Sequence, residues 1–200
     1  KCVAITGSVG KTTTKDMTAS ILGTKYRVHK TSGNYNNHIG LPLTVLSAPE
    51  DTEMLILEMG MSSRGEISLL SRIGQPDAAI ITNIGESHLL DLGSREGIAE
   101  AKMEIVEGLK PEGVLIYNGD EPLLINRIGE VASRKISFGR SITNDYYPAD
   151  IQPGQDEMNF TIEKEGMHSF QLPVLGTHNV LNSLAAIAVG REMGISYEEI

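Results

Sequence analysis

Short, almost wholly apolar runs alternate with amphipathic stretches along the first 140 residues. Apolar runs of this length, flanked by turn residues, are typical of strands buried on both faces of a sheet. They lie at 2–6, 26–31, 54–59, 78–83, 114–118 and 135–138. The stretches between them predict helices at 12–22, 41–46, 66–73, 94–109 and 122–132. This alternation predicts an α/β fold with a doubly wound, mostly parallel sheet and flanking helices.

The pattern changes between residues 145 and 175, where apolar and polar residues alternate in three segments near Asp150, Asn159 and Phe170. Lys164-Glu165-Gly166-Met167 predicts a hairpin turn between the last two, so we expect a small antiparallel sheet at the edge of the domain. A helix over 179–193 then returns to the main body, and Ser196 predicts the N-cap of another. We expect 1–200 to be one domain, the middle piece of a longer protein.

Composition narrows the class of protein. The formal net charge is -9 with no basic stripe, and aromatic residues make up only 4%, which argues against a nucleic-acid partner. No run approaches 18 apolar residues, so no membrane span is expected. The single cysteine, Cys2, excludes an internal disulfide and fits a reducing, cytoplasmic location. We expect it to be a small buried hydrophobe of the first strand.

The strongest local signal is a phosphate-binding loop between the first strand and the first helix. It comprises Gly7, Ser8, Val9, Gly10, Lys11, Thr12 and Thr13. Glycines let backbone N–H groups turn onto phosphate oxygens, Lys11 would reach the β- and γ-phosphates, and the Thr12 hydroxyl would ligate Mg²⁺. Gly7 precedes Gly10 by three residues, whereas the common pattern has a glycine five before it. The alternative is a glycine turn with a solvent-facing lysine.

Four further motifs extend this signal, and with the loop they span almost the whole chain. They are Gly33-Asn34-Tyr35-Asn36-Asn37-His38-Ile39-Gly40-Leu41-Pro42, Glu58-Met59-Gly60, Ala101-Lys102-x-Glu104-Ile105, and His178-Asn179-x-x-Asn182-x-x-Ala185-Ala186. In these motifs the chain resembles the central, ATP-binding domain of the Mur ligase family. Two positions depart: Val9, where the family usually has asparagine, and His38, where an acid is usual.

The resemblance implies three metal ligands besides Thr12. The glutamate matching Glu58 binds Mg²⁺, the histidine matching His88 contributes to a second Mg²⁺ site, and the lysine matching Lys102 is usually carbamylated, which makes it an anionic ligand. Carbamylation requires a neutral amine, so the site must lower the pKa of Lys102. Judged without the resemblance, each has a plainer reading: Glu58 as a capping or solvated acid, His88 as a surface residue, and Lys102 as part of a solvated helix face.

The resemblance also implies nucleotide contacts near the C-terminal helix. The asparagine matching Asn182 reads the adenine edge, for which a carboxamide offers both donor and acceptor. His178 and Asn179 belong to the same motif, or simply cap the helix. We place Asn36 and Asn37 near the phosphates or the substrate; a loop stabilised by local asparagine hydrogen bonds is the alternative.

The implied reaction is ATP-dependent amide-bond formation in peptidoglycan synthesis. A substrate carboxylate attacks the γ-phosphate to give an acyl phosphate, and an amine then displaces phosphate. The Asn-Asn-x-Ile-Gly-x-Pro run favours the branch that adds D-alanyl-D-alanine to UDP-N-acetylmuramoyl-tripeptide. In this family a separate N-terminal domain binds the uridine nucleotide and a C-terminal domain the amine substrate; neither belongs to these 200 residues. We expect a monomer that uses ATP and two Mg²⁺ ions.

Other functions remain as alternatives to this ligase activity. A sister Mur ligase or a folylpolyglutamate-synthase-like ligase would share most of these motifs. A GTPase should carry an Asn-Lys-x-Asp guanine reader, and the nearest string, Asn118-Gly119-Asp120-Glu121, lacks the lysine. A small-molecule kinase or a nucleotide-binding switch module is a further alternative, although a switch needs fewer metal ligands than Glu58, His88 and Lys102 would supply.

Overall fold

A computed structural model describes residues 1–200. Its centre is a six-stranded sheet in which every neighbouring pair is parallel, in the order β2-β3-β1-β4-β5-β6. The strands are β1 Cys2–Thr6, β2 Val28–Lys30, β3 Met54–Glu58, β4 Ala78–Ile81, β5 Val114–Asn118 and β6 Arg134–Phe138. The doubly wound parallel sheet predicted from the alternating pattern is confirmed.

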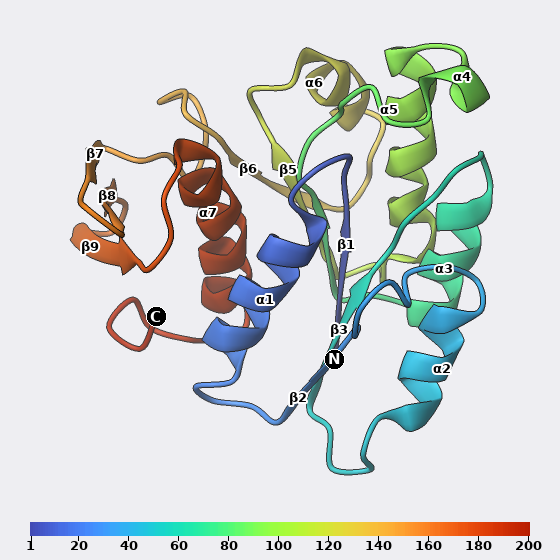
Figure 1. Ribbon diagram of the computed structural model, residues 1–200, viewed down its shortest axis with the longest axis horizontal. Coiled ribbons are helices and arrows are strands. Elements are labelled where there is room, and N and C mark those ends of the chain that lie inside the picture. The colour runs from blue at the N-terminus through green and yellow to red at the C-terminus, as the bar shows by residue number, and fades with distance from the viewer.

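Helices cover both faces of this sheet (Figure 1). On one face lie α1 Lys11–Leu22 and α7 Thr177–Glu192, which pack against each other. On the other lie α2 Gly40–Ser47, α3 Glu66–Gly74, α5 Arg95–Met103, the 3₁₀ helix η1 Glu104–Gly108 and α6 Pro122–Ile128. A single turn, α4 Leu89–Leu92, precedes α5. None of these helices is both long and apolar enough to cross a membrane.

The apolar strands are explained by burial on both faces. In β1, Val3 and Ile5 belong to the core beneath α1 and α7, whereas Cys2 and Ala4 belong to the core beneath α2, α3 and α5. Successive side chains of a strand point to opposite faces, so a strand covered on both sides needs no polar positions. Cys2 is buried as expected, and burial raises the pKa of its thiol to about 12.

The strand order places a crevice at the carboxyl end of β1. From β1 the chain moves outward to β2, returns through β3 beside β1, and then crosses to β4 on the other side. Open α/β sheets bind ligands at such a reversal, outside the carboxyl ends of the strands. Glu58 ends β3 in register with Ile5, while Thr82 directly follows β4. Both therefore flank the loop that leaves β1.

The predicted antiparallel sheet is also present. It comprises β7 Asp150–Pro153, β8 Met158–Glu163 and β9 Met167–Leu172, in that order. Glu165 and Gly166, with φ angles of 55° and 115°, form the predicted turn. The sheet contributes Phe160 and Ile162 to the core beneath α7, which attaches it to the main body (Figure 1).

Some predicted boundaries were wrong. The helix expected over 94–109 changes to 3₁₀ geometry at Glu104, where the Ser71 hydroxyl donates to the carbonyl of Ile105 and accepts the N–H of Gly108. The helix expected to reach 132 ends at Ile128, and the one-turn α4 was not predicted. Ser196 accepts the N–H of Glu199 through its hydroxyl, but only a turn follows. The change at Glu104 depends on a side-chain contact between distant segments.

Candidate functional site

The loop between β1 and α1 approaches its neighbours too closely for side chains at two positions. Gly7 has φ 151°, and a Cβ there would lie 1.8 Å from the Thr82 hydroxyl oxygen. Gly10 has φ 89°, and its Cβ would lie 2.8 Å from Oδ1 of Asn182. Both glycines are therefore required by close approach as well as by backbone conformation.

The backbone amides of this loop divide into two groups. Ser8 and Val9 donate their N–H groups to the side-chain oxygen of Asn83, at 3.1 and 2.9 Å. The next four amides, of residues 10–13, donate to no acceptor in the protein, and α1 has no side-chain cap. Four unbonded amides at the positive end of a helix form an anion-binding site.

The segment after β4 holds the loop in this arrangement. Asn83 donates its side-chain N–H to the carbonyl of Val9 at 2.8 Å, and Thr82 donates its hydroxyl to the same carbonyl at 2.8 Å. Gly85 donates its N–H to the Ser8 hydroxyl at 2.7 Å. We call Thr82, Asn83 and Gly85 the loop clamp. The Val9 side chain is exposed, and its backbone N–H and carbonyl make the contacts with Thr82 and Asn83.

Lys11 and Glu58 bring opposite charges to the loop. Lys11 Nζ donates to the carbonyl of Gly7 at 2.9 Å, and burial lowers its pKa, an effect that nearby Glu58 opposes. The Thr12 hydroxyl lies 3.1 and 3.2 Å from the two carboxylate oxygens of Glu58, which is only 3% exposed. The plainer reading of Glu58 as a solvated acid is therefore wrong.

Thr12 and Glu58 together suit Mg²⁺, because a hydroxyl and a carboxylate are the hard oxygen donors that this ion prefers. No group of three histidine, cysteine, aspartate or glutamate side chains converges in a way that could hold a metal. The protein thus offers part of a coordination shell, as is usual where phosphate oxygens and water supply the remaining Mg²⁺ ligands.

Lys102, on α5, is buried rather than part of a solvated face. It is 3% exposed and makes no hydrogen bond or ion pair. Burial, and secondarily the charge of Lys11, lowers its pKa to about 7. A substantial fraction of this amine is therefore neutral near pH 7, which is the form that carbamylation requires.

Lys11 opens onto a groove of about 350 Å³ that also contains Asn36, Asn37, His38 and His88. Asn37 accepts the N–H groups of Ile39 and Gly40, so its side-chain oxygen stabilises the start of α2 while the residue faces the groove. The reading of a loop stabilised by local asparagine hydrogen bonds is therefore confirmed for Asn37, and its contact with phosphate or substrate stays a prediction. His88 has φ 65°, and its side chain is 42% exposed, 3.6 Å from Asp91.

The motif at the start of α7 also reaches the loop. Asn182 is 8% exposed and lies against Gly10, and its carboxamide has no hydrogen-bond partner in the protein. Asn179 donates to the carbonyl of Leu175, one turn earlier, and His178 packs over Gly176. Neither side chain accepts an N–H of the first turn, and α7 has no side-chain cap, so the helix-capping alternative is wrong for Asn179 and His178. Asn182, by contrast, has a free donor and acceptor beside the loop.

One charged residue near the loop was missed as a site residue. Lys15 is 4% exposed, donates to the carbonyl of Thr31 at 2.9 Å, and lies 3.8 Å from a carboxylate oxygen of Glu58. The Thr31 hydroxyl in turn accepts the N–H of Glu58. Lys15 is four residues after Lys11, so helical spacing could have placed both lysines on one face of α1.

The segment compared with a guanine-binding motif, Asn118-Gly119-Asp120-Glu121, has structural roles. Asn118 accepts the N–H of Asp120 and donates to the carbonyl of Thr82. Asp120 accepts the N–H groups of Arg140 and Ser141. These contacts occupy both side chains and, with the missing lysine, argue against guanine recognition.

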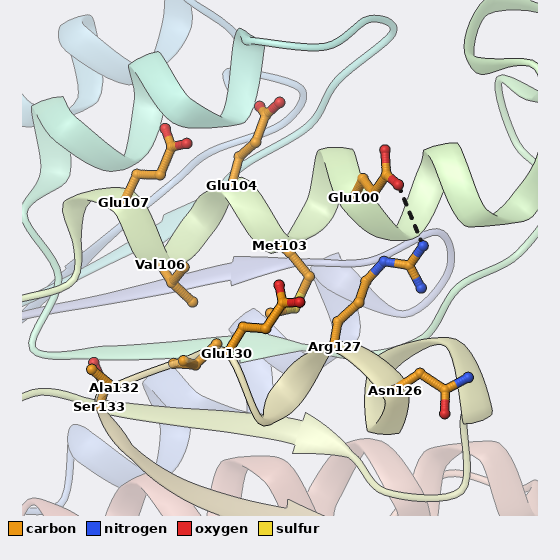
Figure 2. Close-up of a pocket in the computed structure, with 11 residues that line it drawn as sticks. Glu100, Met103, Glu104, Val106, Glu107, Asn126, Arg127, Glu130, Ala132 and Ser133 are labelled. Atoms are coloured by element: carbon orange, nitrogen blue, oxygen red, sulfur yellow. Dashed lines mark hydrogen bonds and ion pairs between the residues drawn. The ribbon is translucent and has the colours of Figure 1, made fainter.

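A second hollow, of about 820 Å³, lies between α5, η1 and α6 and contains no residue of the loop (Figure 2). Its walls carry Glu100, Glu104, Glu107 and Glu130 but a single cation, Arg127, which pairs with Glu100. Glu104 accepts the N–H groups of Gly65 and Ser68 and so helps to start α3. The net negative lining disfavours a polyphosphate.

Comparison with known proteins shows which family this chain resembles. Residues 5–190 match the Mur ligase middle domain. The chain is 58% identical over 199 residues to the UDP-N-acetylmuramoyl-tripeptide–D-alanyl-D-alanine ligase of Bacillus subtilis (strain 168), covering 100% of this chain and 43% of that protein. It is 36% identical over 203 residues to the ligase of the same name from Escherichia coli (strain K12), covering 100% of this chain and 45% of that protein. The chain thus spans less than half the length of these relatives.

Solved structures agree with this match. A crystal structure of MurF from Acinetobacter baumannii superimposes with a TM-score of 0.93 and 37% identity, covering 100% of this chain and 44% of that one. MurF ligase from Thermotoga maritima in complex with ADP superimposes with a TM-score of 0.90 and 32% identity, covering 98% of this chain and 46% of that one. An L. casei FPGS structure, with 13% identity and a TM-score of 0.75 over 100% of this chain and 61% of that one, shares the fold.

Proposed function

We propose, since this chain belongs to the Mur ligase family, that it is the ATP-binding domain of a ligase that forms amide bonds. The observation that carries the proposal is the set of four unbonded amides of residues 10–13, beside Lys11 and the Thr12–Glu58 pair. The complex of the Thermotoga maritima relative with ADP supports the nucleotide.

In this proposal the residues in and beside the loop have separate tasks. The amides of residues 10–13 and Lys11 hold the β- and γ-phosphates, Thr12 and Glu58 hold Mg²⁺, and the free carboxamide of Asn182 reads the adenine edge. When bound, Mg²⁺ would supply charge neutralisation for the negative charge that develops on ADP. Few groups titrating near neutrality are needed, because this step depends on positioning and electrostatics more than on proton transfer.

The substrates follow from the relatives. We propose that the carboxylate of UDP-N-acetylmuramoyl-tripeptide attacks the γ-phosphate, so that an acyl phosphate forms and ADP leaves. The amine of D-alanyl-D-alanine then attacks the acyl carbon, and phosphate leaves. The identity of 58% to a ligase with this name favours this branch over sister ligases. Since those relatives are more than twice as long, further domains would bind the uridine nucleotide and the dipeptide.

Lys102 has a specific place in the proposal. Its buried amine, which lacks a hydrogen-bond partner, would add to CO₂ and lose a proton, so that a cation becomes a carbamate anion. The anion would lie near Lys11, whose charge lowers the pKa of the unmodified amine. The family resemblance pairs this carbamate with His88, which faces the same groove as Lys11, as ligands of a second Mg²⁺.

The test is ADP release by the complete polypeptide that contains these residues. It would receive ATP, Mg²⁺ and UDP-N-acetylmuramoyl-tripeptide, with and without D-alanyl-D-alanine. We expect release that depends on the dipeptide, is abolished by Lys102→Ala and is restored by a short carboxylic acid. Lys135→Ala, an exposed lysine without a partner, is the matched control. Release that ignores the dipeptide would indicate a sister ligase, and an indifferent Lys102→Ala would exclude the carbamate.

A further inference from the structure

Three lysines and one carboxylate surround the phosphate loop. Lys11 lies close enough to Glu58 and to Lys102 for each charge to affect it, and Lys15 lies 3.8 Å from Glu58. Before nucleotide arrives and while Lys102 is unmodified, the site holds more positive than negative charge. A divalent cation entering alone would meet this excess in a poorly hydrated setting, where charges interact strongly.

Lys15 is the cation most tightly fixed beside the metal ligand. Its ammonium is 4% exposed and is anchored by the carbonyl of Thr31, whose hydroxyl accepts the N–H of Glu58. It lies 3.6 Å from Asp16, but Asp16 already bonds Lys30 at 2.8 Å. The charge of Lys15 is therefore held beside Glu58 through Thr31, whereas Lys11 bonds the carbonyl of Gly7 within the phosphate loop.

We propose that Lys15 is a positioning residue that neutralises Glu58 and so prevents the site from binding a divalent cation until nucleotide is present. A triphosphate reverses the sign of the local charge and supplies the oxygen ligands that Thr12 and Glu58 lack. Metal and nucleotide therefore bind together.

The inference rests on the proposed function in one respect only, namely that Thr12 and Glu58 are the metal ligands. Its test involves no turnover, so it can fail while the ligase assignment holds. Mn²⁺ is the probe, since it also prefers oxygen ligands and the free ion is counted directly by electron paramagnetic resonance. Titrations of the complete polypeptide would be run with and without ADP, and the Mn²⁺ that ADP binds in a protein-free blank would be subtracted.

For the wild type, we expect Mn²⁺ binding to be weak without ADP and much tighter with it. Lys15→Met keeps the length of the side chain and removes its charge, so it should tighten nucleotide-free Mn²⁺ binding by at least about tenfold. Damage to the fold would weaken binding, so a gain cannot arise from a merely structural role. Lys15→Arg should bind as weakly as wild type.

Lys135→Met is the matched control, because it removes an exposed lysine that contacts neither Asp16 nor Glu58. It should leave nucleotide-free Mn²⁺ binding unchanged. The proposal is overturned if wild type binds Mn²⁺ equally well with and without ADP, a result that needs no variant. It is also overturned if Lys15→Met, folded by circular dichroism, binds nucleotide-free Mn²⁺ no better than wild type.

Discussion

The loop clamp makes a quantitative prediction for Asn83→Ala. The substitution removes three hydrogen bonds, two accepted from Ser8 and Val9 and one donated to Val9. Each contributes about 0.5–1.5 kcal/mol, and the lower part of that range applies because Val9 is largely exposed. Thr82 and Gly85 still hold the loop. We therefore expect a loss of about 2 kcal/mol in the ordering of the loop.

Because a disordered loop must be ordered again when phosphate binds, this loss should appear as nucleotide affinity. About 2 kcal/mol corresponds to roughly 30-fold weaker ADP binding by calorimetry. Asn126→Ala, which deletes an exposed asparagine of α6, should leave the affinity unchanged. Asn83→Asp keeps an oxygen that can accept the N–H groups of Ser8 and Val9, but it replaces the N–H that donates to the carbonyl of Val9 with a second acceptor, so it should not restore binding. A folded Asn83→Ala protein with wild-type ADP affinity would refute the reasoning.

Two further predictions concern stability. In protein whose Lys102 is unmodified, burial lowers the pKa of this amine to about 7, so above that pH the unfolded chain holds a proton that the folded one has lost, and stability rises with pH. In urea titrations, unfolding free energy should increase by about 2 kcal/mol more in wild type than in Lys102→Met between pH 7 and 9; equal increases would contradict this. Gly7→Ala should lower stability by about 1–3 kcal/mol in thermal melts and weaken ADP binding, because the new Cβ collides with Thr82. Gly129→Ala, with open space around it, should change neither, and a tolerated Gly7→Ala would show that the loop can move.

Local side-chain chemistry explains why the main architecture could be predicted. Runs such as 78–83 and 114–118 are apolar because both faces of a parallel strand are buried, and the hairpin at Glu165-Gly166 needs residues that tolerate positive φ. Such requirements act within a few residues of chain. Helix ends that depend on distant contacts, such as the change of geometry at Glu104 caused by Ser71, were missed for the same reason.

The sequence by itself determined the fold class, the position of the phosphate loop and the family, because glycine spacing, apolar runs and motif residues are properties of short segments. Only the tertiary structure decided which side chains meet. It buried Lys102 without a partner, placed Lys15 beside Glu58 and set Asn83 across the loop, 74 residues from Val9. Burial and charge pairing depend on segments brought together by the strand order, which no single stretch of sequence records.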